Sequence, residues 1–434
     1  MTNIIIVAVS FLVLMLLGVP VAFAMGIPCI VWVLFLRDGM PIVVIPQNIM
    51  SYMLSFTLIS MPGFLFVGRM MNTCGITDRL FKFAVAMVGR FRGGLAHANA
   101  LASMLFASMS GTAIGDAGGL GLVEMKMMKD AGYQDDVAAG ITASSSILGP
   151  IIPPSSCMIL LGAVAEISVA SLFYGGVLPG ILMAGALMLN IAFRAKFTKK
   201  GRAWPKTPIP WREAIKTIPQ AIPALGTFVV ILGSIMGGLC TATEAAILAA
   251  WYSVLLGVCY KKLTFKTLWK TLLETVDACG VFMLIVAVAS LLAWEFTIEG
   301  LPGILKVFMQ SMVANGSTVG LLLICGLIFL AMGCFLDTSA GILLVAPILM
   351  PVVSSLGINA VHFGLVMIIG LMIGIITPPF GICLFVVSEV GKVPVKKVTM
   401  EAIKYLPAMV VVLLIVILFP DVVLWLPRLF GLSV

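Results

Sequence analysis

Apolar runs of membrane-spanning length make up most of the chain, and short polar or basic segments separate them. The runs cover residues 4–36 (two crossings broken near residues 18–20), 52–72, 137–165, 172–193, 222–239, 245–260, 276–294, 361–387 and 407–419. An α-helix needs roughly 20 apolar residues to cross the hydrocarbon core of a bilayer. The pattern therefore predicts an all-α polytopic membrane protein.

Two further apolar stretches, residues 95–129 and 318–354, are interrupted by polar residues near their middle. If each is a re-entrant hairpin, 23 of the 26 Lys and Arg residues fall on one side of the membrane, leaving Arg37, Lys306 and Arg428 opposite. An excess of basic residues marks the cytoplasmic side. We therefore expect two re-entrant hairpins and two periplasmic termini. The mixed segments 78–92 and 263–271 are either interfacial helices or extensions of crossings.

The composition agrees with a membrane protein and excludes several other classes. The apolar set makes up 61% of the 434 residues, charged residues make up 10%, and the mean hydropathy is +1.19; soluble domains are about 25% charged. The nine cysteines form no Cys-x-x-Cys pair, and the only histidines are His97 and His362. Zinc, haem and iron–sulfur sites therefore lack their usual ligands. The net charge of +8 comes from the cytoplasmic loops, so no nucleic-acid partner is expected.

The two halves of the chain repeat the same landmarks at a spacing of 225 residues. This offset places Pro153-Pro154 on Pro378-Pro379, and it places the polar tip 108–112 on residues 333–337. Because the first hairpin enters from the cytoplasm and the second from outside, the two repeats are inverted. Inverted repeats are typical of secondary transporters, whose sites lie at the repeat interface near the midplane.

Each half also predicts a helix broken in mid-membrane behind its hairpin tip. Two adjacent prolines near a glycine unwind a helix, and carbonyls freed in hydrocarbon are costly unless something binds them. A plain kink satisfied by neighbouring helices is the alternative. Sodium would satisfy the carbonyls, and two histidines are too few for a proton wire. We therefore expect sodium at Ser108, Gly111, Gly149, Ile152 and Pro154 in the first half, and at Gly333, Gly374, Thr377 and Phe380 in the second.

The second arm of each hairpin begins with free N–H groups, which favour anions. An anionic substrate is therefore expected between the halves, at Ser110, Thr112, Ser155, Ser156, Asp337, Thr338 and Ser339. Carboxylates in mid-membrane are functional candidates, so Asp337 either receives polar substrate groups or caps the second arm. Asp116 and Glu124 are interpreted as structural, and no arginine is expected in the site.

Four motifs in order resemble the large membrane subunit of tripartite ATP-independent periplasmic (TRAP) transporters. They are SMSGTAIGDAGGLG at 108–121, GPIIPPS at 149–155, GLCTATEAA at 238–246 and GIITPPFG at 374–381. The resemblance spans essentially the whole chain. It implies a sodium-driven elevator transporter of the bacterial inner membrane that takes an organic acid, such as sialic acid, a C4-dicarboxylate or a sugar acid, from a periplasmic binding protein. A separate small four-helix membrane subunit and membrane lipid would be its other partners.

The same resemblance implies a division into a scaffold and a mobile transport domain, and its sodium and substrate sites fall on the residues named above. The predicted parts are 1–94 (scaffold of repeat 1 with an interfacial arm helix), 95–170 (hairpin 95–130 and broken helix 134–166), 171–216 (crossing and cytoplasmic linker), 217–316 (scaffold of repeat 2), 317–390 (hairpin 317–355 and broken helix 359–390) and 391–434 (C-terminal helix).

Two other functions are alternatives to transport. An intramembrane enzyme would need a nucleophile with a base or a metal cluster at membrane depth, but the sequence has no Gly-x-Ser-x-Gly and no His-Glu-x-x-His. A passive anion channel would share the polar broken helices, and its flux would exceed carrier turnover without any need for a binding protein. The sequence therefore favours a secondary transporter.

Overall fold

The computed structural model describes residues 2–37, 39–314 and 318–432, and every regular element in these ranges is a helix. Five helices are long and apolar enough to cross a membrane by length and composition, and three bent helix pairs raise the number to as many as eight. The five are α12 (Val169–Phe197), α14 (Trp211–Met236), α15 (Ala242–Cys259), α16 (Phe265–Ile298) and α19 (Thr338–Ser355). The prediction of an all-α polytopic chain is confirmed.

Helix boundaries in the described residues follow several of the sequence signals. The N-terminal apolar run is broken at residues 17–20 between α1 (Thr2–Leu16) and α2 (Val21–Val31), and α2 continues into η1 (Trp32–Leu36). The mixed segment 78–92 lies largely in a separate helix, α5 (Ile76–Val88). The segment 263–271 instead forms the first turns of α16, so it is a helical extension rather than a separate interfacial helix.

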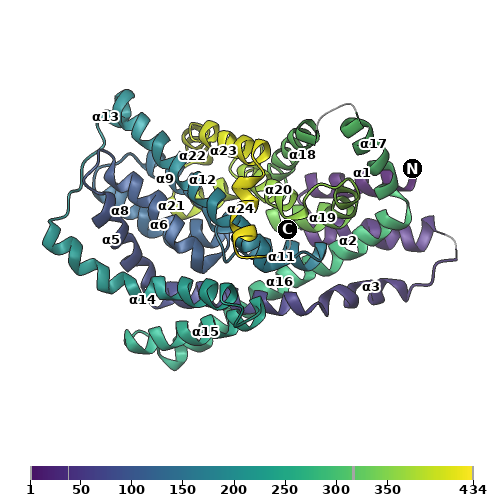
Figure 1. Cartoon of the computed structure of the whole chain (residues 1–434), viewed down its shortest axis with the longest axis horizontal. Helices are drawn as coiled ribbons and strands as arrows, with labels where there is room; N and C mark the ends of the chain where they lie inside the picture. Colours follow the sequence, from purple (N-terminus) through teal and green to yellow (C-terminus); the bar gives the residue numbers. More distant parts are fainter. Residues whose placement is uncertain (1, 38, 315–317, 433–434) are drawn as a thin grey trace.

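One group of helices packs around α16 along the lower side of the molecule in Figure 1. There α4 (Ser60–Thr73) contacts both α15 and α16, and α16 also contacts α2 and α3 (Val44–Met53). Further contacts join α14 to α15 and to α5. The short 3-10 helix η2 (Phe56–Ile59) and the α-helix α17 (Leu301–Ala314) border this group. Its α4 and α16 form one wall of the site described below.

A second group contains the two hairpins and the two broken helices. In the first half, α6 (Gly94–Ser110) packs on α9 (Asp135–Ser145) and α10 (Leu148–Ile151). In the second half, α18 (Thr318–Gly333) packs on α20 (Ala360–Gly374). The other members are α8 (Gly121–Asp130), α11 (Ser156–Ala165), α12, α19, α21 (Ile382–Gly391), α22 (Val395–Ala402), α23 (Leu406–Leu418) and α24 (Asp421–Leu429).

The 225-residue repeat predicted from the sequence is visible in this packing. The offset pairs α6 with α18 and α9–α10 with α20, and in each half the first hairpin arm packs on the N-terminal part of the broken helix. It also pairs the end of α4 with the end of α16. Both Pro-Pro peptide bonds, at 153–154 and 378–379, are cis. The four helix segments that surround the two breaks are therefore built alike.

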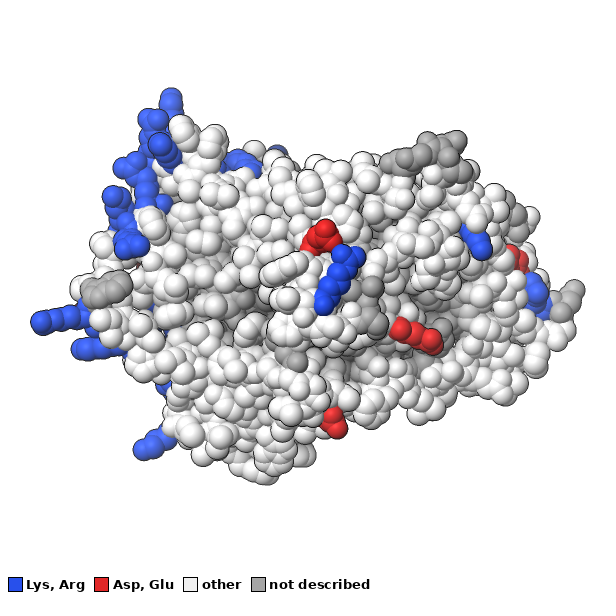
Figure 2. All heavy atoms as spheres, in the orientation of Figure 1, with Lys and Arg blue, Asp and Glu red and all other residues white. Residues whose placement is uncertain are grey.

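Charge is distributed unevenly along the long axis of the molecule. Figure 2 shows that Lys and Arg gather at the end where Figure 1 places α13 (Lys199–Arg202) and the start of α14. The opposite end, which carries the N-terminus and α3, shows few charged side chains in this view. The basic end matches the side that the sequence assigns to the cytoplasm.

Candidate functional site

The first hairpin turns at Gly111, which follows α6 and has the left-handed φ of +57° that favours glycine. Thr112 then caps the second arm, because its hydroxyl accepts a hydrogen bond from the Gly115 N–H at 3.1 Å. The second arm begins with the short helix α7 (Ala113–Gly115) and continues as a π-helix, η3 (Asp116–Leu120). The side chains of Ser108 and Ser110 lie outside the part that the structure describes.

The second hairpin turns between Gly333 and Asp337. The Asp337 carboxylate caps α19, because its Oδ2 accepts a hydrogen bond from the Ser339 N–H at 2.9 Å. The structure therefore shows Asp337 in the capping role, one of the two roles that the sequence suggested for it. The carboxylate is only half-buried and also faces a cavity, so capping does not exclude contact with a substrate. The offset of 225 pairs this cap with Thr112.

At the first helix break, Ser156 is hydrogen-bonded to the tip of the first hairpin. Ser156 donates its hydroxyl to the Gly111 carbonyl at 2.7 Å, and its backbone N–H contacts the same oxygen at 3.2 Å. The backbones also approach closely: a Cβ on Gly149 would lie 3.0 Å from the Thr112 carbonyl oxygen. Ser155 is fully buried and donates to the Pro150 carbonyl while capping α11. Its hydroxyl therefore serves the break itself.

The second helix break is held by glycine backbones. A Cβ added to Gly374 would lie 2.5 Å from the Gly333 Cα, so only glycine permits this approach. The Thr377 hydroxyl donates to the Ile373 carbonyl at 2.7 Å. The N–H of Gly381 donates to the Cys334 carbonyl at 3.2 Å, which joins the break to the hairpin tip. The Phe380 side chain is 44% exposed and lies against the Phe335 ring.

Both tips and both breaks border one cavity of about 690 Å³. The opposite wall consists of α4 and α16, which contribute apolar side chains such as Leu65 and Phe282. Five residues expected at the anion site line this cavity, namely Thr112, Ser156, Asp337, Thr338 and Ser339. Ser155 is not among the lining residues. The structure thus brings together, on one wall, chemical groups that are 225 residues apart in the chain.

Arg69 is a cavity residue that the sequence analysis missed. It lies on α4, lines the cavity and is 38% exposed, and its Nη1 is 3.4 Å from the Glu274 Oε2. No arginine was expected beside the hairpin tips, and the structure places Arg69 in the wall of the cavity that they border. A usable signal was present, because Arg69 lies inside the apolar run 52–72 and ionisable residues within spans are functional candidates. Asn72, one turn further along α4, lines the same cavity.

A buried polar cluster supports the second arm of the first hairpin from behind. The Asn99 amide donates to the Glu124 Oε2 at 2.7 Å and to the Thr142 hydroxyl at 2.8 Å, and it accepts from Ser145 at 2.6 Å. Asp116 is 2% exposed, and within the described residues neither of its oxygens has a hydrogen-bond partner. The cluster ties α6, α8 and α9 together. This geometry agrees with the structural interpretation of Glu124.

Comparisons with known proteins agree with these features. The family model described as "Tripartite ATP-independent periplasmic transporter, DctM component" matches residues 8–422. A sialic acid TRAP transporter large permease protein, SiaM, from Vibrio cholerae is 40% identical over 96% of both chains. A C4-dicarboxylate TRAP transporter large permease protein, DctM, from the same species is 34% identical over 96% of this chain and 95% of that one.

A solved structure shows a similar fold. The YdaH transporter of Alcanivorax borkumensis superimposes with a TM-score of 0.62 over 95% of this chain and 97% of the other, at 15% identity. At this identity the likeness concerns the fold alone. Together with the family match over nearly the whole length, these findings show that the chain belongs to the DctM family of large TRAP-transporter permeases.

Proposed function

We propose that the protein is a sodium-coupled secondary transporter that takes up an organic acid anion by an elevator movement. The observation that carries the proposal is the cavity between α4–α16 and the paired hairpin tips. A cavity with one wall on each helix group suits a movement in which the second group carries a substrate past the first. The chain is proposed to reside in the bacterial inner membrane with both termini periplasmic.

The cavity chemistry favours a carboxylate that also carries hydroxyl or amide groups. Arg69 offers positive charge from α4, and the N-terminal end of α19, which favours negative charge, borders the cavity at Thr338 and Ser339. The Asp337 carboxylate and the Ser156 hydroxyl oxygen can accept hydrogen bonds from hydroxyl or amide groups of a substrate. Relatives named for sialic acid, C4-dicarboxylates and 2,3-diketo-L-gulonate are all consistent with such a ligand.

Sodium is proposed as the coupling ion at the two helix breaks. Backbone oxygens crowd around both glycines: the Thr112 carbonyl lies beside Gly149, and the Leu330 carbonyl oxygen would be 2.5 Å from a Cβ on Gly374. Hard cations bind backbone carbonyl oxygens, and unwound carbonyls in broken helices coordinate sodium in transporters. The proposed ligands remain those predicted from the sequence.

The proposal includes two protein partners, a periplasmic substrate-binding protein and a small four-helix membrane subunit. Another ion-coupled anion transporter or channel of the same inverted-repeat class, working without a binding protein, is the alternative. The two differ in whether flux depends on the binding protein and in whether turnover is limited to that of a carrier.

Reconstitution tests this proposal. Proteoliposomes that contain this chain and its small partner are mixed with the cognate binding protein loaded with radiolabelled acid. We expect uptake with an inward sodium gradient and no ATP, and no uptake without the binding protein. Uptake that is unchanged in potassium-only buffer would contradict sodium coupling, and uptake without the binding protein would favour the alternative.

A further inference from the structure

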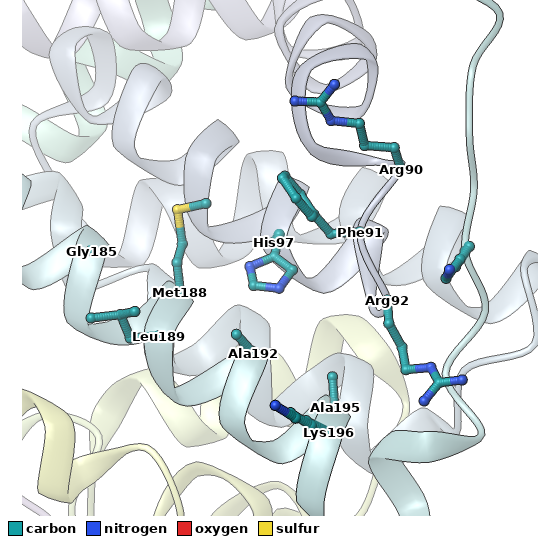
Figure 3. Close-up of a pocket in the computed structure, with 11 residues that line it drawn as sticks. Arg90, Phe91, Arg92, His97, Gly185, Met188, Leu189, Ala192, Ala195 and Lys196 are labelled. Atoms are coloured by element: carbon teal, nitrogen blue, oxygen red, sulfur yellow. The ribbon is translucent and has the colours of Figure 1, made fainter.

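A second cavity, of about 790 Å³, lies at the basic end of the molecule, away from both hairpin tips. It is bordered by the loop between α5 and α6, by the C-terminal half of α12 and by Lys206 of the following linker. Figure 3 shows Phe91 and His97 facing the α12 side chains across it, with Arg90 and Arg92 extending to opposite sides of the loop. We call this cavity the basic pocket and define it by Arg90, Arg92, His97, Leu189, Lys196 and Lys206.

Four positive charges line the basic pocket without compensation. Arg90, Arg92, Lys196 and Lys206 are all exposed, and within the described residues none of them forms a salt bridge and no Asp or Glu lines the pocket. Two basic groups nearby are paired instead. Arg194 Nη2 is 2.6 Å from Glu401 Oε2, and Lys200 Nζ is 3.1 Å from Asp136 Oδ2. The pocket therefore presents four unpaired positive charges on one surface.

His97 adds a polar group that faces the same space. The residue is 6% exposed, it lines the pocket, and within the described residues its Nδ1 has no hydrogen-bond partner. Figure 3 shows its ring between Phe91 and Met188. The Phe91 ring packs edge-on against it with centroids 6.2 Å apart. Because buried polar atoms in folded proteins are nearly always paired, this unpaired nitrogen makes His97 a polar part of the pocket wall that a ligand could engage.

The remaining surface of the basic pocket is apolar and continues along a membrane-spanning helix. Leu189 is 72% exposed and Phe91 50% exposed, and Phe193 and Phe197 follow on α12 at 62% and 57%. Since α12 is apolar enough to cross a membrane, its basic C-terminal end lies where hydrocarbon meets the headgroup region. A ligand for this surface must be anionic at one end and apolar at the other.

We propose that the basic pocket binds an anionic phospholipid of the cytoplasmic leaflet. Its phosphate would lie near Arg92 and Lys196, Arg90 and Lys206 would add positive potential around it, and an acyl chain would follow Leu189 along α12. Basic pockets between helices on this side of a membrane suit such headgroups. The Thr207 N–H donates to the Gly89 carbonyl at 3.0 Å, which connects the linker to the end of α5. A lipid bound beside this contact would add a second connection, between α5, α6 and α12.

Native mass spectrometry of the purified full-length chain tests the proposal. Phosphatidylglycerol and phosphatidylethanolamine are titrated separately, and inorganic phosphate is used as a competitor. We expect phosphatidylglycerol to bind at least about tenfold more tightly than phosphatidylethanolamine, because each interfacial basic group adds attraction to anionic lipid. Equal binding of the two lipids would overturn the proposal. So would full competition by inorganic phosphate, which would show that the pocket recognises the phosphate without the acyl chain.

Matched variants separate this pocket from general surface charge. The quadruple change Arg90→Gln, Arg92→Gln, Lys196→Gln and Lys206→Gln should abolish the preference for phosphatidylglycerol. The control removes four other basic residues through Lys261→Gln, Lys262→Gln, Lys266→Gln and Lys270→Gln, and should retain the preference. Equal losses in both would contradict a specific site. His97→Gln removes no formal charge and is expected to weaken binding several-fold; unchanged binding in a folded His97→Gln protein would remove His97 from the site.

Discussion

The two helix breaks occupy equivalent positions in the repeat but are held together differently. At the first, Ile152 to Ser155 are all buried, and serine hydroxyls satisfy the carbonyls of Gly111 and Pro150. At the second, Pro378 to Phe380 are exposed, and contact with the hairpin depends on glycine backbones at 333 and 374. The same Pro-Pro pair therefore forms a buried break in the first half and an exposed break in the second. We expect a cation at the second break to exchange more readily in this conformation.

The caps of the two hairpins also differ, and changing the charged cap, Asp337, has the largest expected effect. Thr112 and Asp337 both cap a second arm, but only Asp337 carries charge into the cavity. We predict that Asp337→Ala abolishes uptake and lowers the free energy of unfolding by about 1 kcal/mol. Asp337→Asn should keep the cap and its stability yet still lose most transport.

Thr112→Ala is the matched control for Asp337. It should cost a similar ~1 kcal/mol of stability but reduce uptake only several-fold. Initial uptake rates in proteoliposomes and thermal unfolding in detergent give the two readouts. Normal uptake by Asp337→Asn would show that the negative charge has no part in the site.

The glycine contact at the second break gives the next largest effect. In Gly374→Ala, the new Cβ would lie 2.5 Å from two backbone atoms, Gly333 Cα and Leu330 O. Helix backbones cannot move apart without disrupting α18–α20 packing, so we expect a loss of about 3 kcal/mol and of transport. Gly149→Ala, where the nearest atom is at 3.0 Å, should cost less.

Gly280→Ala controls for the change of residue type, because nothing lies within 4 Å of its added Cβ. It should leave stability unchanged or slightly higher, since alanine favours helix. The expected order of destabilisation is therefore 374, then 149, then 280. Equal thermal unfolding of all three variants would refute the contrast between the two breaks.

Residues 156 and 381 are equivalent in the repeat, so exchanging serine and glycine between them tests how differently the two breaks are stabilised. Gly381 has a φ of +57°, and a Cβ there would lie 2.7 Å from the Leu384 Cδ1. Gly381→Ser is expected to cost about 2 kcal/mol, mostly through its left-handed backbone. Ser156→Gly loses one hydroxyl hydrogen bond and should cost about 1 kcal/mol. A larger loss for Ser156→Gly, measured by thermal unfolding, would reverse this ranking.

Much of the fold is predictable from local sequence, because its determinants are local. The apolar runs specify helices, and the absence of a backbone N–H at the paired prolines specifies where α10 and α20 end. Ser156 lines the cavity and Ser155 does not, and this depends on the direction in which the chain leaves the break. That direction is fixed by packing against Gly111, which no local pattern encodes.

The cavity's other wall was missed for a similar reason. Arg69 belongs to α4, far in sequence from both hairpins, and it reaches the site only because α4 packs beside α16 and faces the tips. Arg69 was grouped with the cytoplasmic basic residues, so its position inside an apolar run was not used as a sign of function. The basic pocket likewise joins residues 90–97 with 185–206, which come together only in the folded chain.

Labelling of single cysteines gives the smallest expected effect, because it compares the exposure of the two breaks without measuring transport. In a Cys259→Ser background, which removes an exposed thiol, Phe380→Cys is expected to react quickly with a hydrophilic maleimide. Ser155→Cys should stay unreacted, because that position is fully buried. The parent protein gives the background from the other cysteines. Equal labelling rates at 155 and 380 would contradict the enclosed and open description.

The dependence of initial uptake rate on sodium concentration tests the central claim, that the two breaks each hold a cation around one anion cavity. With the chain, its small partner and the loaded binding protein in proteoliposomes, two sites predict a sigmoidal curve with a Hill coefficient above one. Thr377→Val, which removes one proposed ligand, should shift that curve to higher sodium. A curve that is flat, or hyperbolic and unchanged by Thr377→Val, would contradict the account.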